Sequence, residues 1–574
     1  MILGTTLGEP ASGATQPQQG GSRVTIDEIF RRIAQRRPEA LALADAPNRK
    51  TFTDGAPRRL TFAQADRMVS AIAGRLRKME LPTDSIVGIQ LPNIVENILA
   101  ILGVMRAGMI AAPLPLLWRR ADAVAALSRV GAKALITCGH VGGVNHCQLA
   151  MRVAADVFSI RYVCGFGADL PDGVVPFDDL FTAEKLDPVP ALDRERASNP
   201  AAHLAAITFD VGETGIVPVA RSHLQLLAGG LGVLLESRLV QDATMLSTLA
   251  PSSFAGICLT LLPWLLSGGK LLLHHAFDPP VLVGQWRGDD RCGALVIPGP
   301  VAFRLAEAGV FSRTGPAGVL APWRSPERLG SSPDWRARDT VLVDVSVFGE
   351  IAAVAARRGA NGRPAPIPFG GIVAPRGSPG AVVVAEVTAT AHGTVALRGP
   401  MVPHHNFPPG AERGGQPHLA IGRAGVIDTG YSCRLDPGAR TLAITGPPPG
   451  IVNVGGYRFP LHLLQDTLGG LDPPATLAPL PDPLLGQRLV GNAVDRYAVQ
   501  AALNASGVNP IVAAAFVDRS EGQRGCSARP DVDAPSTELK LLVVNYIYSI
   551  IMLYTDRFPI SCSGSGGEAS WCGE

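Results

Sequence analysis

The sequence predicts an α/β protein: a large N-terminal domain of layered α/β subdomains plus a small β-barrel, followed by a small α+β C-terminal domain. Three observations predict this fold. From about residue 25 to 137 helix-like and strand-like segments alternate, an order typical of parallel sheets covered by helices. Between about 365 and 445 the chain changes to short β-rich runs separated by glycine and proline. The segment TGPPPG (445–450) then interrupts both kinds of element, and a short α+β unit follows.

The helices and strands of the first half are predicted from hydrophobic periodicity. Residues 61–79 have apolar residues at helical spacing after Thr61, which can cap the helix. Residues 85–92 form an apolar run that ends at a proline, and predict a buried strand. Residues 93–115 predict a helix with Asn93 as its cap, followed by a strand, and 121–137 repeat the helix-then-strand order. The alternation resumes between 224 and 309.

Length and composition limit the possible classes. At 574 residues the chain is too long for one core, and with 47% hydrophobic and 17% charged residues it is a globular protein of several domains. The formal net charge of +2, without a basic stripe, indicates no nucleic-acid partner. Lysine is scarce and occurs only at positions 50, 78, 133, 185, 270 and 540.

Cysteine usage and the two termini bear on location. The nine cysteines include no CxxC pair, so neither a zinc site nor a disulfide framework is predicted, and a reducing cytoplasm fits best. Residues 1–24 are interpreted as a flexible leader because a basic segment followed by a long apolar one is missing. The apolar stretch 541–555 is shorter than the ~20 residues that a spanning helix needs, so no stable membrane span is expected.

Several motifs occur in a fixed order along the chain. The first half contains LPN at 91–93, an AG followed by a strand and a proline, and the strand AKALIT at 132–137. The second half continues with LRGPMV (397–402), DTGYSCRLD (428–436), VNVGGYRFP (452–460) and PDPLLGQRLVG (481–491). In this order the sequence resembles the adenylate-forming (AMP-binding) superfamily, which includes acyl- and aryl-CoA synthetases, over about residues 25–519.

The resemblance implies a domain division and a reaction. It implies an AMP-binding-like N-terminal domain at 25–445, a truncated C-terminal lid domain at 446–519 and an atypical tail at 520–574. Family members activate a carboxylic acid with ATP and Mg²⁺ to an acyl-adenylate, and most then transfer the acyl group to coenzyme A. The small-molecule partner expected here is therefore a fatty or aromatic acid, or its acyl-CoA. The tail is either native or the product of an altered gene end.

The segment ITFDVGETGIVPVARSH (207–223) stands where the family has its phosphate-binding loop. The family's lysine is missing here, and Glu213 places a negative charge inside the turn. Arg221 could supply a cation, although a guanidinium does not replace a lysine point charge directly, and His223 is a second weak catalytic candidate. A turn kept for its shape is the alternative interpretation. The residues that match the family's nucleotide-binding pattern are Gly212, Thr214 and Gly215.

The adenine and magnesium segment of the family corresponds to SVFGEIA (346–352). Phe348 and Gly349 match the first half of this segment, and the resemblance implies that the Phe348 ring stacks on adenine. Ala352 occupies the position of the family's magnesium-binding glutamate, and Glu350 lies two residues earlier, on the same face of an extended strand. Glu350 is thus a weak magnesium candidate. The alternative is an ordinary solvated carboxylate at a strand end.

The ribose, thiol and lysine motifs are partly retained. Tyr431 stands in place of the family's ribose-binding aspartate, whereas Arg434 matches a family nucleotide-binding position. Gly455 and Gly456 match the glycine turn that lines the family's coenzyme A channel. The catalytic lysine of the family's lid is missing, because no lysine occurs between Lys270 and Lys540 and the latter lies in an unrelated context.

Two functions remain open at this point. One is an AMP-forming acid–CoA ligase whose activity is weak or lost, because loss of one donor to the developing charge typically costs ~10²–10³ in rate and several are missing here. The other is a non-catalytic descendant that binds an acyl group, an acyl-CoA or a partner protein. Ser253 or Phe254 in PSSFAG (251–256) is expected to line an acyl pocket, or else to be part of the core packing.

Overall fold

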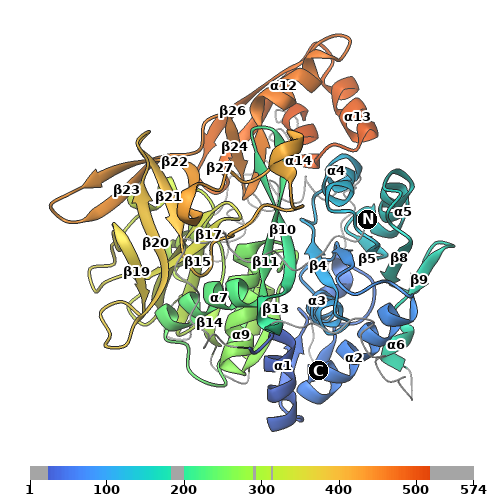
Figure 1. Ribbon diagram of the computed structural model, residues 1–574, viewed down its shortest axis with the longest axis horizontal. Coiled ribbons are helices and arrows are strands. Elements are labelled where there is room, and N and C mark those ends of the chain that lie inside the picture. The colour runs from blue at the N-terminus through green and yellow to red at the C-terminus, as the bar shows by residue number, and fades with distance from the viewer. Residues whose placement is uncertain (1–22, 183–198, 289–291, 312–314, 518–574) are drawn as a thin grey trace, which may run out of the picture.

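The computed structural model describes residues 23–182, 199–288, 292–311 and 315–517. Two large sheets with helices between and around them form most of the chain, a third sheet lies beside them, and a small C-terminal unit covers one end (Figure 1). The predicted fold class is confirmed. The predicted tail, and all of the leader except residues 23 and 24, lie outside the described residues.

The first large sheet has seven strands in the order β11-β10-β4-β3-β5-β8-β9. All neighbours are parallel except the hairpin of β10 and β11. The strands are β3 (Ile86–Ile89), β4 (Ile110–Pro113), β5 (Ala134–Cys138), β8 (Tyr162–Phe166), β9 (Val174–Pro176), β10 (Leu204–Gly212) and β11 (Gly215–Ser222). Their near-continuous apolar sequences match a parallel sheet that is buried on both faces.

The second large sheet has eight strands in the order β17-β16-β15-β14-β12-β13-β1-β2. Only the strands at its two edges, β2 and β17, run antiparallel to their neighbours. The strands are β1 (Leu41–Ala44), β2 (Arg59–Thr61), β12 (Thr244–Ser247), β13 (Lys270–Leu273), β14 (Cys292–Val296), β15 (Gly318–Trp323), β16 (Val341–Phe348) and β17 (Ala352–Arg357).

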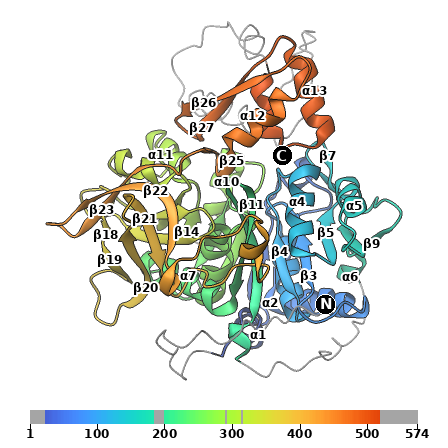
Figure 2. The ribbon, with the colours of Figure 1, turned by 45° about the horizontal axis from the view of Figure 1, so that its top comes forward.

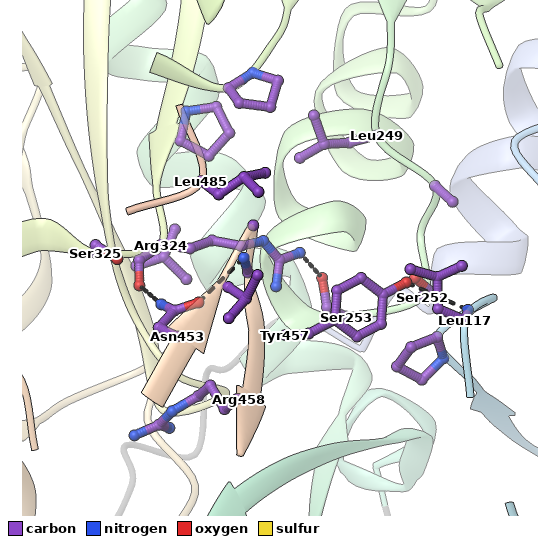
Figure 3. A pocket seen from close by; sticks show the side chains of 18 of the residues that line it. Leu117, Leu249, Ser252, Ser253, Arg324, Ser325, Asn453, Tyr457, Arg458 and Leu485 are labelled. Carbon is purple, nitrogen blue, oxygen red and sulfur yellow. Dashed lines mark hydrogen bonds between the residues drawn. The ribbon is translucent and has the colours of Figure 1, made fainter. Parts of the chain in front are cut away.

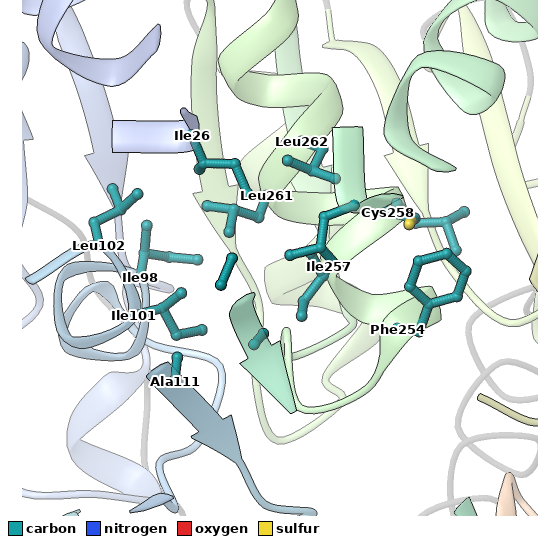
Figure 4. Packing of buried hydrophobic residues seen from close by; sticks show 14 of the residues in the cluster. Ile26, Ile98, Ile101, Leu102, Ala111, Phe254, Ile257, Cys258, Leu261 and Leu262 are labelled. Carbon is teal, nitrogen blue, oxygen red and sulfur yellow. The ribbon is translucent and has the colours of Figure 1, made fainter. Parts of the chain in front are cut away.

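Helices cover both sheets and fill the space between them. They are α1 (Ile26–Arg36), α2 (Phe62–Lys78), α3 (Val95–Arg106), α4 (Arg120–Val130), α5 (His146–Asp156), α7 (His223–Ser237), α8 (Phe254–Gly256), α9 (Leu262–Ser267), α10 (Pro279–Trp286) and α11 (Gly299–Glu307). All twelve residues of α3 are buried, including the polar residues Glu96, Asn97 and Arg106. Ile98, Ile101 and Leu102 of α3 face the segment around Ile257 and Leu261, which joins the two halves into one core (Figure 4).

The start of α3 corrects one prediction. Asn93 does not cap this helix; its side-chain amide donates to the carbonyls of Ser247 and His274, at 2.9 and 3.1 Å, and so joins two segments of the second sheet. The cap comes from another element, since Asp45 accepts a hydrogen bond from the Val95 N–H at 2.8 Å. The predicted cap Thr61 is confirmed, because it accepts from the Gln64 N–H.

The third sheet lies where the sequence predicts the small barrel. It has six antiparallel strands in the order β18-β23-β22-β21-β20-β19. The end strands β18 and β19 do not pair with each other, so the sheet is an open half-barrel and not a closed barrel. The strands are β18 (Ile367–Pro368), β19 (Gly370–Ala374), β20 (Val382–Ala389), β21 (Thr394–Arg398), β22 (Ile427–Asp436) and β23 (Thr441–Gly446).

Residues 451–517, which we call the lid, form a separate four-stranded antiparallel sheet with three helices and lie over one end of the large body (Figure 2). The elements are β24 (Ile451–Val454), β25 (Tyr457–Pro460), α12 (Leu461–Gly469), β26 (Thr476–Asp482), β27 (Gly486–Asn492), α13 (Arg496–Ser506) and α14 (Pro510–Ala513). The prolines of 446–450 separate the lid from β23, as the sequence predicts. Among the described residues, no helix is long and apolar enough to cross a membrane.

Candidate functional site

A cavity of about 330 Å³ lies between the large body and the lid (Figure 3). On its body side, Thr248, Arg324 and Gly349 directly follow the parallel strands β12, β15 and β16, and Pro298 lies two residues after β14. In an open parallel sheet, loops at the carboxyl ends of the strands form the ligand crevice. This position makes the cavity the candidate site.

The cavity has an apolar wall and a polar end. The apolar wall includes Leu116, Leu117, Trp118, Phe209, Leu249 and Leu485. The charged residues that line it are Asp210, Arg324, Arg328, Glu350 and Arg458, and no lysine is among the lining residues. A mostly apolar concavity with a few polar groups is the usual form of a small-molecule site.

Arg324 extends across the cavity. Its Nη2 donates to the Ser253 hydroxyl at 2.8 Å, and its backbone carbonyl accepts from the Asn453 side chain of the lid at 2.6 Å (Figure 3). The stem of Arg324 lies against the lid's glycine turn, where a Cβ on Gly456 would overlap its Cδ. Gly456, with φ of 95°, therefore provides the space that Arg324 occupies.

A salt bridge holds the lid against the body. Arg458 of β25 and Asp210 of β10 approach to 2.5 Å, with both side chains largely buried. The other Asp210 oxygen accepts from the Glu350 N–H at 2.9 Å. Gly349, with φ of 54°, lies so close to this pair that a Cβ there would overlap the Asp210 carboxylate. Gly349 thus makes room for the Arg458–Asp210 pair, and Gly456 makes room for Arg324, which donates to Ser253.

Further contacts support the same closed arrangement. The Leu117 N–H donates to the Tyr457 hydroxyl at 3.3 Å, and Arg328 donates to the Pro483 carbonyl at 2.7 Å. Burial raises the pKa of Tyr457, so its hydroxyl stays protonated at neutral pH.

Glu350 is buried, and both its carboxylate and its backbone carbonyl accept structural hydrogen bonds. Its Oε2 accepts from the Phe254 N–H at 2.6 Å, and its backbone carbonyl accepts from Arg221. Burial, and secondarily Asp210, raise its pKa from 4.5 to about 7, against the effect of Arg324. The interpretation as a solvated strand-end carboxylate is wrong, since the residue is only 5% exposed.

The phosphate-loop segment is a tight hairpin. The pairing of β10 with β11 continues to Gly212 opposite Gly215, so only Glu213 and Thr214 form the turn. A two-residue turn has no row of free amide groups around an anion. None of Gly212, Thr214 and Gly215 lines the cavity, although Asp210 and Val211 do.

The two catalytic candidates have structural contacts. Arg221 is 1% exposed; it donates to the carbonyls of Glu350, Ile351 and Met401, and its guanidinium carbon lies 3.7 Å from the centre of the Phe254 ring. His223 is buried at the start of α7, where its Nδ1 accepts from the Ile26 N–H at 3.3 Å. Neither residue lines the cavity.

Of the remaining nucleotide candidates, Phe348 and Arg434 lie away from the cavity, whereas Gly349 lines it. Phe348 is fully buried, with its ring edge-on to Tyr431 at 5.6 Å between centres. Tyr431 donates to the Arg324 carbonyl at 3.4 Å, and Arg434 is exposed farther along β22. Gly349, Glu350, Gly455 and Gly456 do line the cavity, as does Ser253, whereas Phe254 lies in the core beneath Arg221.

The described residues do not fit ATP and Mg²⁺ in the way the resemblance implies. The aromatic ring is buried, the phosphate turn is closed, and Glu350 and Asp210 are bonded to Phe254, Arg458 and backbone amides. Within the described ranges no group of three His, Cys, Asp or Glu could hold a metal ion.

The coenzyme A channel does not fit either, because Arg324 fills the space beside Gly456. The segment where the lid lysine would stand begins after residue 517, outside the described residues.

Sequence reasoning missed Arg324, Asn453, Arg458 and Asp210. Arg458 directly follows the quoted glycine turn, and Asp210 stands inside the quoted phosphate segment, so two of them were near recognised motifs. Arg324, in LAPWRSPERL, has no such marker. Its position follows only from the order of the strands in the second sheet.

The raised pKa of Glu350 predicts a pH-dependent stability. The pKa of this carboxyl is 4.5 in the unfolded chain and about 7 in the folded chain. Its ionisation therefore does not destabilise the fold below pH 4.5 and has its full destabilising effect above pH 7. Glu350→Gln is therefore expected to raise the free energy of unfolding relative to the unmodified chain by about 3 kcal/mol at pH 8 and by little at pH 4.5. Urea denaturation at several pH values measures this, with exposed Asp334→Asn as the control. A difference that stays constant with pH would contradict the prediction.

Part of the chain is similar in sequence to known proteins. Residues 30–289 match the family model described as AMP-binding enzyme. Long-chain fatty acid transport protein 1 of Homo sapiens is 38% identical over 187 residues, which are 32% of this chain and 26% of that protein. The alignment thus spans about a quarter of the relative's length.

Solved structures share the fold over most of the chain. The amide bond synthetase McbA from Marinactinospora thermotolerans superposes with a TM-score of 0.61 and 18% identity, over 84% of this chain and 93% of McbA. ATP-bound MatB from Rhodopseudomonas palustris gives a TM-score of 0.55 and 16% identity, over 84% of this chain and 92% of MatB.

Proposed function

We propose that this chain, whose residues 30–289 match the family model described as AMP-binding enzyme, binds a carboxylic acid in the cavity beneath the lid and forms an acyl-adenylate weakly or not at all. The acid, by resemblance, is fatty or aromatic. An acid–CoA ligase of ordinary activity is the outcome that would replace this proposal.

One observation carries the proposal. The cavity keeps an apolar wall and a cationic side chain, Arg324, while the groups that the superfamily uses for the nucleotide are bonded to other parts of the chain. Phe348 is in the core, Glu350 accepts from a backbone amide, and the phosphate hairpin is closed. An acid can thus enter a site whose nucleotide contacts are missing.

Members of the superfamily use ATP, and MatB is one neighbour with ATP bound. In this chain we derive no step through ATP, Mg²⁺ or coenzyme A, since the described residues do not fit them. What the residues can do is bind an anion at Arg324, exclude water from the apolar wall, and hold the lid closed through Arg458 and Asp210. A cytoplasmic location and the absence of a nucleic-acid partner remain predictions.

Two assays test the proposal together. ATP–pyrophosphate exchange with a panel of aromatic and medium-chain acids is expected to stay near background, because several charge-stabilising donors are absent and each such loss costs ~10²–10³ in rate. An active acyl-CoA synthetase serves as the positive control. Exchange well above background would contradict the loss of activity.

Calorimetric titration with the same acids tests the binding half. We expect saturable binding of at least one acid, and no measurable binding of ATP. A chain that binds ATP but none of the acids would contradict the proposed function.

A further inference from the structure

We propose that Arg324, assisted by the Ser253 hydroxyl, is the residue that binds the carboxylate of the ligand, and that the ligand is a monocarboxylic acid with a single aromatic ring or a medium-length chain. This inference rests on the proposed function and names the recognition residue and the ligand class for the same cavity. Arg324 lies in no motif that the sequence analysis identified, and it directly follows β15 of the second large sheet.

The position of Arg324 favours this role. It directly follows β15, and its side chain reaches Ser253 at 2.8 Å across the cavity (Figure 3). Within the described ranges it forms no ion pair, and the Ser253 hydroxyl is the partner of its guanidinium. A guanidinium has five N–H donors, so most of them remain available to the two oxygens of a carboxylate.

The other charged groups of the cavity are already engaged. Asp210 is paired with Arg458, and Glu350 accepts from the Phe254 N–H. Arg328 donates to the Pro483 carbonyl at the rim of the lid. Burial lowers the pKa of His275, also in the lining, to about 4, so this ring is neutral at pH 7. Of the arginines in the described lining, Arg458 is paired with Asp210 and Arg328 donates to the lid, whereas Arg324 extends across the cavity to Ser253 and is therefore the cation best placed for a ligand anion.

The size and walls of the cavity define the rest of the ligand. A volume of about 330 Å³ is at the lower end of the range for small-molecule sites. Beside the guanidinium, Leu117, Trp118 and Leu249 form an apolar surface that suits a ring or a short alkyl chain. This space favours a free acid over a nucleotide or an acyl-CoA.

The lid sets the position of Arg324 through a glycine. The Gly456 N–H donates to the Asn453 side chain at 3.0 Å, which fixes the turn against the Arg324 stem. Any side chain at 456 would displace that stem. Gly456→Ala is therefore expected to weaken acid binding although residue 456 carries no charge.

The experiment compares matched ligands on the full chain. Calorimetric titration uses octanoate with octanamide, and benzoate with benzamide, so that each pair differs in the charge of one group. We expect the unmodified chain to bind at least one acid tenfold or more tightly than its amide. Arg324→Gln is expected to weaken acid binding by about ten- to a hundredfold, the range of a charge-assisted hydrogen bond, and to leave amide binding unchanged.

Arg434→Gln is the matched control, because Arg434 is exposed and outside the cavity; its acid binding is expected to equal that of the unmodified chain. Acid and amide bound equally by the unmodified chain would overturn the inference without any variant. An Arg324→Gln variant that binds the acid as tightly as the unmodified chain would also overturn the inference. Neither of these two results would contradict the proposed function. Failure to bind any acid would overturn the proposed function and the inference together. If Arg324→Gln does not fold, Gly456→Ala replaces it, and unchanged acid binding there is the contradicting result.

Discussion

Replacing Arg221 by methionine is expected to lower the free energy of unfolding by about 3–5 kcal/mol. Arg221 is 1% exposed and donates to three backbone carbonyls, those of Glu350, Ile351 and Met401. Methionine keeps an apolar stem against Phe254 but leaves these buried acceptors without a donor, and each such group costs about 1–3 kcal/mol. Burial lowers the pKa of Arg221 to about 10, so the side chain is still charged at neutral pH.

Urea denaturation followed by circular dichroism measures this effect. Arg304→Met is the matched control, because Arg304 is 43% exposed and pairs only with the neighbouring Glu307 at the surface; its loss is expected to cost less than about 1 kcal/mol. An unchanged urea midpoint for Arg221→Met would contradict the structural role of Arg221. The alternative, that Arg221 supplies a cation for catalysis, would then have to be considered again.

The second large effect is expected at Glu96, whose replacement by alanine should lower the free energy of unfolding by about 3–5 kcal/mol. Glu96 is fully buried and accepts from Arg49 at 2.7 and 2.9 Å and from Arg58 at 2.7 Å. Burial opposes its ionisation, but Arg49 and Arg58 outweigh this effect and lower the pKa of Glu96. Without the carboxylate, Arg49 keeps only Asp45 as its acidic partner in the described cluster.

The control for Glu96 is Glu307→Ala, which removes a carboxylate that also pairs with an arginine but is 53% exposed. We expect its urea midpoint to change little, since exposed ion pairs contribute about 0–1 kcal/mol. Equal effects of the two substitutions would show that burial of the Glu96 cluster does not determine its contribution to stability.

The elements whose contacts are local could be predicted from the sequence. The Thr61 cap of α2, the buried strand β3 and the proline break before the lid each depend on residues a few positions apart. The order of motifs, which is also a linear property, indicated the resemblance to AMP-binding enzymes, and residues 30–289 match that family model. Gly349, Glu350, Gly455 and Gly456 line the cavity, and the binding roles that the resemblance implies for them stay predictions.

The tertiary structure decided what each of those side chains contacts. The sequence alone determined the elements, their order and the missing lysines, because periodicity, capping and composition are expressed over short stretches of chain. It did not determine that Asn93 joins two distant segments, that Phe348 is in the core, or that Arg458 pairs with Asp210, 248 positions away. Arg324 became the central residue of the site only because strand order brings it between Ser253 and the lid. Contacts between segments so far apart depend on the packing of whole sheets, and no local pattern encodes them.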